Sequence, residues 1–136
     1  MQETIRISTD AHEGLYDLTK EVERLVLKSG VTTGIANVYV RGATAGIMIQ
    51  ENWDQSVQND VVSLLRKIIP AGVWEHDKQD GNGDAHLKAG LVGPDATIPI
   101  INGRLGLSTW QNIFLCEFDG PRREREIVVT ILKEYN

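Results

Sequence analysis

An Asn-Gly dipeptide near the end of the chain limits the available folds more than any other feature. Asn102-Gly103 lies between two runs rich in branched apolar residues, 97–101 and 104–107. Asn and Gly both tolerate the positive φ that a two-residue type I′ turn requires, so this pattern is a strong hairpin signal. The fold must therefore contain antiparallel strands.

The remaining segments predict more strands than helices. Residues 4–8, 35–40, 45–49, 112–118 and 126–132 carry the branched or alternating pattern of strands. Helical spacing predicts helices from Leu15 to a stop at Gly30, from an N-cap at Ser56 to Pro70, and over 85–92 after a cap at Asp84. In the second helix, Leu64 and Ile68 are among the residues expected to face inward.

The order of these segments decides the fold class. Helices and strands do not alternate regularly, which favours an α+β fold over a doubly wound sheet. We expect a compact sandwich with a mixed, mostly antiparallel sheet and two or three helices. The length of 136 residues predicts one domain over 1–136.

Composition and charge exclude several classes of function. A net charge of −5 gives no basic footprint for nucleic acid. No apolar run approaches the roughly 18 residues that cross a bilayer, and residues 1–10 do not resemble a signal peptide. The single cysteine, Cys116, allows no internal disulfide. We expect a cytoplasmic protein that binds neither nucleic acid nor membrane.

The stretch HDKQDGNGDAH, residues 76–86, carries the densest set of metal-ligating side chains. Asp80, Asn82 and Asp84 fit the first positions of an EF-hand loop. Ala85 replaces the required glycine, however, and Leu91 replaces the bidentate glutamate, which excludes a calcium loop of this kind.

Two interpretations of this stretch remain open. His76 and His86 could reach one zinc or other transition-metal ion, because neutral imidazole is a good ligand. No cysteine pair accompanies them, so the spacing matches no closed zinc motif. Alternatively, the aspartates only form turns and cap the next helix.

Glu117 is the most unusual residue of the predicted strand 112–118. Both faces of this strand carry apolar residues, so Glu117 falls among core neighbours, and Gln111 shares its parity. A buried carboxylate needs a cation, a metal or a raised pKa. The alternative is that Glu117 lies half exposed at the strand end, paired with an arginine.

Arg122, Arg123 and Arg125 follow directly after this strand. Guanidinium groups match phosphate oxygens, although a solvated turn in which they pair with glutamates is also consistent with the pattern. Strand alternation would place Arg122 opposite Arg123 and Arg125, so the three are not expected to bind one anion together. Packing is the default role of Trp53, Trp74 and Trp110, but each could also form a pocket wall.

Several of these motifs, in this order, resemble the YjbQ family, often labelled secondary thiamine-phosphate synthase-like. The resemblance covers residues 5–132. The motifs are Glu51-Asn52, His76…Asp80-x-Asn82…His86, Gly103-x-Leu105, Thr109-Trp110-Gln111, Glu117-x-Asp119 and Pro121-Arg122-x-x-Arg125.

The resemblance implies a homotrimer with polar clefts between subunits. It also implies a weak activity that joins a hydroxymethylpyrimidine diphosphate to a thiazole phosphate and releases pyrophosphate. On this hypothesis Arg122 and Arg125 hold phosphate, and a divalent metal, zinc or magnesium, lies near His76, His86 and Asp80. The residues expected to act on the substrate are Trp110, Gln111 and Glu117.

The alternative is a trimeric module that binds a divalent metal or small phosphorylated metabolite without turnover. No nucleophile–base pair stands out in the sequence, and Cys116 lies inside an apolar strand. Many family members carry a histidine-threonine pair where this chain has Gly42-Ala43-Thr44, and Ser108 replaces the usual glycine before Thr-Trp-Gln. One histidine that could serve a metal is therefore missing.

Overall fold

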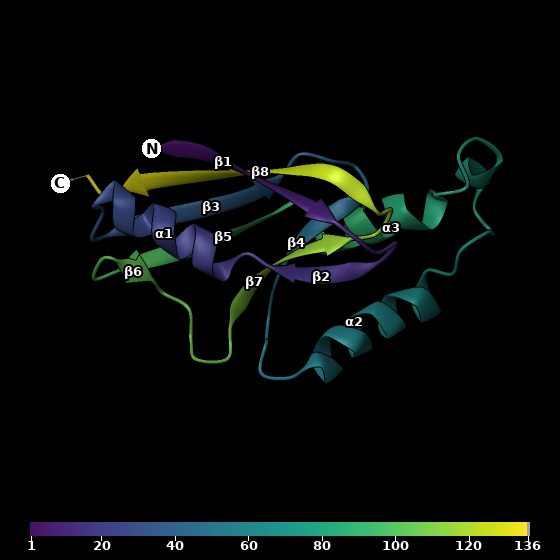
Figure 1. The fold of residues 1–136 in the computed structure, drawn as a ribbon, viewed down its shortest axis with the longest axis horizontal. Helices are drawn as coiled ribbons and strands as arrows, with labels where there is room; N and C mark the ends of the chain where they lie inside the picture. Colours follow the sequence, from purple (N-terminus) through teal and green to yellow (C-terminus); the bar gives the residue numbers. More distant parts are fainter. Residues whose placement is uncertain (136) are drawn as a thin grey trace.

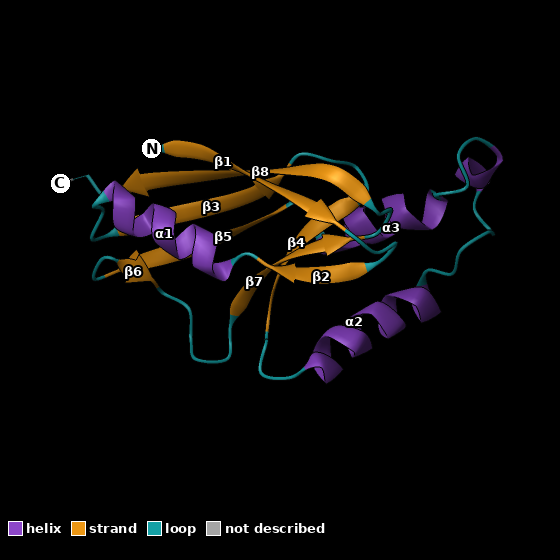
Figure 2. Ribbon diagram, in the orientation of Figure 1, coloured by secondary structure: helices purple, strands orange, loops and turns teal. Residues whose placement is uncertain are grey.

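Two antiparallel β-sheets form the frame of this computed structural model, which describes residues 1–135 (Figures 1 and 2). The first sheet has the order β1-β8-β3-β5-β6 and the second β2-β7-β4. The strands are β1 (Gln2–Thr9), β2 (Gly14–Asp17), β3 (Gly34–Val40), β4 (Ala45–Gln50), β5 (Asp95–Ile101), β6 (Arg104–Leu105), β7 (Asn112–Glu117) and β8 (Arg122–Lys133). The helices are α1 (Thr19–Ser29), α2 (Gln55–Ile68), the short 3₁₀ helix η1 (Glu75–Lys78) and α3 (Gly83–Val92).

This arrangement confirms the predicted α+β class. All the strand pairs within residues 1–135 are antiparallel. The predicted hairpin joins β5 to β6, with Ile100 opposite Leu105. Asn102 and Gly103 have φ of 51° and 79°, the left-handed conformation that a type I′ turn needs at both positions.

The main hydrophobic core lies between the sheets and α1. Helix α1 packs against β6, β7 and β8, and it buries Val22, Leu25 and Val26. Its predicted start was wrong, because Leu15 belongs to β2 and pairs with Cys116. The helix begins at Thr19, whose backbone amide donates to the Asp17 carboxylate at 2.8 Å.

Helix α2 is less buried than its apolar periodicity predicts. Leu65 packs with residues of α3 and β7, but Leu64 and Ile68 are 57% and 54% exposed, which corrects the expectation that both face inward. Figure 1 shows α2 extending away from the two sheets. Asp54, rather than Ser56, caps its start by accepting from the Ser56 amide at 2.7 Å.

Residues 1–135 include no helix with the length and apolar character needed to cross a membrane.

Two leucines of α1 test how the core holds this helix. Leu25 is 1% exposed and Leu27 is 62% exposed. We expect Leu25→Ala to lower the free energy of unfolding by about 2–5 kcal/mol, because it leaves a cavity in the core. Leu27→Ala should change it by less than about 0.5 kcal/mol. Urea denaturation measures both, and equal losses would contradict this packing.

Candidate functional site

Glu117, at the end of β7, is completely buried and forms an ion pair with Arg125 of β8. The Arg125 guanidinium donates through Nε to Oε1 at 3.0 Å and through Nη2 to Oε2. The Thr9 hydroxyl donates to Oε1 at 2.7 Å, and the Asp119 amide donates to Oε2 at 3.0 Å. The expectation that a buried Glu117 needs a cation is therefore correct. The alternative was right about the strand end and the arginine partner but wrong about the exposure of the side chain.

These contacts set the ionisation of Glu117. Burial by itself would raise the pKa of the carboxyl group. The hydrogen bonds from Arg125, Thr9 and the Asp119 amide outweigh it, so the pKa lies below its ordinary value. Glu117 is thus a fixed anion that orients Arg125, and it is poorly suited to act as a general acid near neutral pH.

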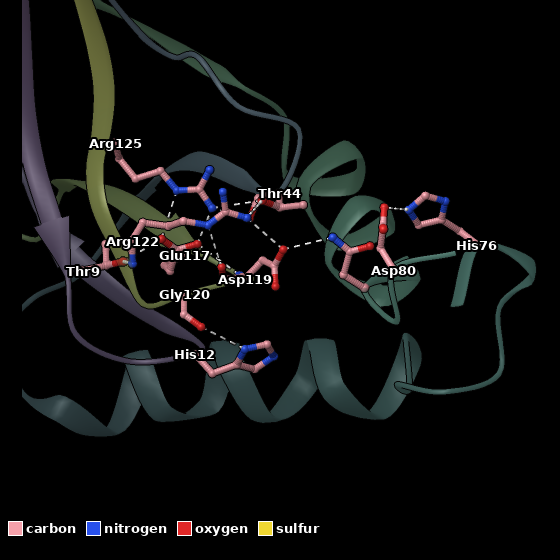
Figure 3. Close-up of polar contacts among 11 residues, drawn as sticks. Thr9, His12, Thr44, His76, Asp80, Glu117, Asp119, Gly120, Arg122 and Arg125 are labelled. Atoms are coloured by element: carbon pink, nitrogen blue, oxygen red, sulfur yellow. Dashed lines mark hydrogen bonds and ion pairs between the residues drawn. The ribbon is translucent and has the colours of Figure 1, made fainter. Parts of the chain in front are cut away.

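Arg122 and Arg125 lie closer together than strand alternation predicts. Both Nη2 atoms approach the Thr44 hydroxyl, at 3.0 Å from Arg125 and 3.5 Å from Arg122 (Figure 3). The pairing of β1 with β8 shifts between Ile7 and Thr9, where two steps along β1 face three along β8. An extra residue of this kind is a β-bulge, which breaks the alternation and corrects the prediction that the two arginines diverge.

A second ion pair borders the first on its exposed side. Arg122 Nη2 contacts the Asp119 carboxylate at 2.9 Å, and the Asn82 amide donates to the same carboxylate at 3.0 Å. The Arg122 side chain is 43% exposed. Asn82 Oδ1 is buried and has no hydrogen-bond partner within residues 1–135, so one acceptor beside the cluster is unused.

His76 and His86 lie together, as the sequence predicts, with ring centroids 4.8 Å apart and planes at 88°. His76 Nε2 is 3.4 Å from the Asp80 carboxylate. In Figure 3 His76 and Asp80 lie to one side of Arg122 and Arg125. Asp84 is not the cap, because α3 begins one residue earlier at Gly83, and the Asp84 carboxylate instead contacts the buried Lys88 at 2.9 Å.

These donors do not form a complete metal site in one chain. Within the described part of the chain, no three His, Cys, Asp or Glu side chains are grouped so that they could hold a metal ion. A zinc or magnesium ion beside His76 and His86 would need ligands from water or a second chain. The predicted metal therefore stays a prediction.

Trp110 and Gln111 are separated from the cluster around Glu117. They precede β7, whereas Glu117 ends it. Six residues of strand span about 20 Å at roughly 3.3 Å per residue. The Gln111 side-chain oxygen accepts from the Ser108 amide at 2.9 Å, so it is used within its own loop. One chain does not bring the three predicted catalytic residues together.

The sequence did not single out Thr9 and Thr44, two residues of this cluster. Each is at least 78 positions from the residues that its side chain contacts here: Thr9 lies 108 from Glu117, and Thr44 lies 78 from Arg122 and 81 from Arg125. Such contacts depend on strand pairing, and threonine is an ordinary strand residue. Asp119 could be found from the sequence only through the Glu117-x-Asp119 motif, since it follows Glu117 by two residues.

Comparison with known proteins agrees with this fold and these motifs. The profile of the family described as UPF0047 protein YjbQ-like matches residues 3–134. The chain belongs to this family. A UPF0047 protein of Methanocaldococcus jannaschii is 46% identical to it over 127 residues, which cover 93% of this chain and 91% of the relative. The resemblance inferred from the motifs is thus confirmed.

Further relatives extend the match to structure. UPF0047 protein YugU of Bacillus subtilis is 41% identical, covering 90% of this YjbQ-like chain and 92% of the relative. A YbjQ-like protein of unknown function from Sulfolobus solfataricus P2 has the same fold, with a TM-score of 0.95 at 38% identity over 98% of this chain and 97% of that one. The family and fold are therefore established, and the activity has to be argued from the site.

The low pKa of Glu117 predicts an acid-dependent loss of stability. A carboxyl group whose folded pKa is depressed stabilises the fold above its unfolded pKa, and this contribution is lost as pH falls through the folded value. We expect the free energy of unfolding of the native chain to fall more steeply than that of Glu117→Gln between about pH 6 and pH 3. Glu23→Gln, a change at an exposed glutamate outside the cluster, should retain the native slope. Parallel slopes for the native chain and Glu117→Gln, from chemical denaturation, would contradict the assignment.

Proposed function

We propose that Arg122, supported by Arg125 and Thr44, binds the phosphate or diphosphate group of a small metabolite. The observation that carries this proposal is the convergence of two guanidinium groups on one hydroxyl. Among residues 1–135, no hydrogen bond engages Nη1 of Arg122, and 43% of this side chain is exposed, so it retains donors for a ligand. Phosphate oxygens suit such paired donors.

The two arginines have different roles in this proposal. Arg125 is 5% exposed, and its charge is balanced by Glu117, so it is a rigid positioning residue. Arg122 is the residue that would contact the phosphate, because its side chain is 43% exposed. Its partner Asp119 also lies near the surface, with 22% of its side chain exposed. An incoming phosphate would compete with Asp119 for Arg122, while Asn82 continues to hold Asp119 in place.

The reaction that this site would serve is the one implied by the YjbQ resemblance. The bond between the hydroxymethyl carbon of the pyrimidine and its diphosphate breaks, and the thiazole nitrogen forms a new bond to that carbon. Stabilising the departing diphosphate is the main catalytic requirement, and prepositioned cationic donors supply it. Arg122 would bind the leaving group. Trp110 and Gln111 could contact the heterocycle only if a second copy of the chain brings them to this site.

A non-catalytic binding module is the second candidate, and specific observations favour it. Burial raises the pKa of the Cys116 thiol to about 12, so this thiol is inert. Glu117 is held as an anion by its hydrogen bonds and is not available to move protons. Steady-state release of pyrophosphate from the diphosphate substrate would separate the enzyme from the module.

Three further expectations about the chain stay predictions. They are the homotrimer, the divalent metal near His76 and His86, and the cytoplasmic location. The homotrimer bears most directly on function, because Trp110 can approach Arg122 only from a second copy of the chain. Light scattering at micromolar concentration would measure the mass.

The phosphate site is tested by calorimetry with pyrophosphate. We expect Arg122→Ala to weaken binding by about 1.5–3 kcal/mol, because it removes charge-assisted hydrogen bonds to the anion. Arg123→Ala is the matched control, since Arg123 is an exposed neighbour with the same charge, and it should leave the affinity nearly unchanged. Equal affinities of the native chain and Arg122→Ala would refute the site.

A further inference from the structure

Two exposed tryptophans form a corner at the opposite end of β7 from Glu117. Trp53 comes from the loop between β4 and α2, and Trp110 from the loop between β6 and β7. Their ring centroids are 5.3 Å apart and their planes meet at 81°. They are 75% and 53% exposed, so both indoles leave large apolar surfaces in contact with solvent. Figure 1 shows the two loops extending together from the same end of the sheets.

The corner adjoins a hollow that contains two carboxylates. This cavity of about 320 Å³ is lined by Asp17 and Glu23, with Lys20 as its one basic lining residue. Its wall also includes Gln111, the residue that follows Trp110 in the chain. The Asp17 carboxylate accepts from the Asn52 amide at 2.6 Å, which connects the hollow to the residue before Trp53.

A third carboxylate follows Trp53 directly. Hydrogen bonds from Ser56 lower the pKa of Asp54, so this group is ionised at neutral pH. Asp17 and Glu23 outnumber Lys20 in the adjoining hollow, and Asp54 adds a further negative charge to the loop that carries Trp53. The faces of aromatic rings also carry negative potential, and perpendicular rings beside carboxylates are the usual means of holding an alkylated ammonium group.

We propose that the Trp53–Trp110 corner and its adjoining hollow bind a small organic cation of the quaternary ammonium class. Phosphates and carboxylates are disfavoured by Asp17, Asp54 and Glu23. An inorganic cation would lose its hydration at the indole faces, whereas a methylated ammonium is weakly hydrated and has apolar surface to contact both rings. Within one chain the corner and the phosphate site lie at opposite ends of β7, so choline binding does not require Arg122 and pyrophosphate binding does not require Trp53.

Choline and its neutral isostere 3,3-dimethyl-1-butanol test this site at constant ionic strength. The Trp74→Phe chain, in which tryptophan fluorescence reports only Trp53 and Trp110, provides the titration. We expect a saturable fluorescence change with choline and at least fivefold weaker binding of the neutral alcohol, because only the cation gains from the ring faces and carboxylates.

Variants then assign the binding to the corner by calorimetry with choline. Trp53→Ala and Trp110→Ala should each weaken binding at least fivefold, and Asp17→Asn should weaken it while keeping a hydrogen-bond acceptor. Glu3→Gln is the control, because Glu3 pairs with Lys28 and does not line the hollow.

Three results would overturn the proposal. The first is equal affinity for choline and the neutral alcohol, and the second is unchanged choline binding in both tryptophan variants. The third is no response to choline together with self-association that Trp53→Ala abolishes, which would identify the corner as an interface between copies. Pyrophosphate binding reports on Arg122 alone, so failure here leaves the phosphate site to be judged separately.

Discussion

The buried ion pair between Glu117 and Arg125 is the interaction on which the rest of this region depends. It joins the end of β7 to β8, and Thr9 of β1 and Thr44 before β4 complete its hydrogen bonds. A buried charge is tolerated only when it is paired and fully hydrogen-bonded, and removing one partner typically costs 3–5 kcal/mol. Four segments of the chain must therefore meet here together, and Arg122 is placed at the surface as a consequence.

Two glycines, Gly42 and Gly120, pack closely around this ion pair, and their lack of a side chain leaves space for it. A Cβ atom on Gly42 would lie 2.8 Å from Arg125 Nη1, and one on Gly120 would lie 2.1 Å from the Ala11 carbonyl oxygen and 2.9 Å from the Glu117 side chain. Gly120 thus cannot be replaced without moving the backbone. A side chain at position 42 would have to displace the outer part of the Arg125 guanidinium.

Local patterns in the sequence predicted the parts of this structure that depend on local physics. Asn102-Gly103 determined a hairpin, and the alternation along β7 placed Glu117 in the core with a need for a cation. The closeness of Arg122 to Arg125 could not be predicted from the sequence. The prediction that they separate assumed regular strand alternation, and the bulge in β8 breaks that alternation. Leu15 and α2 were misjudged because apolar spacing alone does not show which neighbours a segment packs against.

The central claim is that Glu117 and Arg125 stabilise the fold only as a pair, because each neutralises the buried charge of the other. A double-mutant cycle with Glu117→Leu, Arg125→Met and the combined variant, measured by urea denaturation, tests it most directly. We predict that each single change costs about 3–5 kcal/mol, because each leaves a buried charge without its partner. The combined change should cost far less than their sum, since it removes both charges. Single costs that simply add in the combined variant would contradict the account.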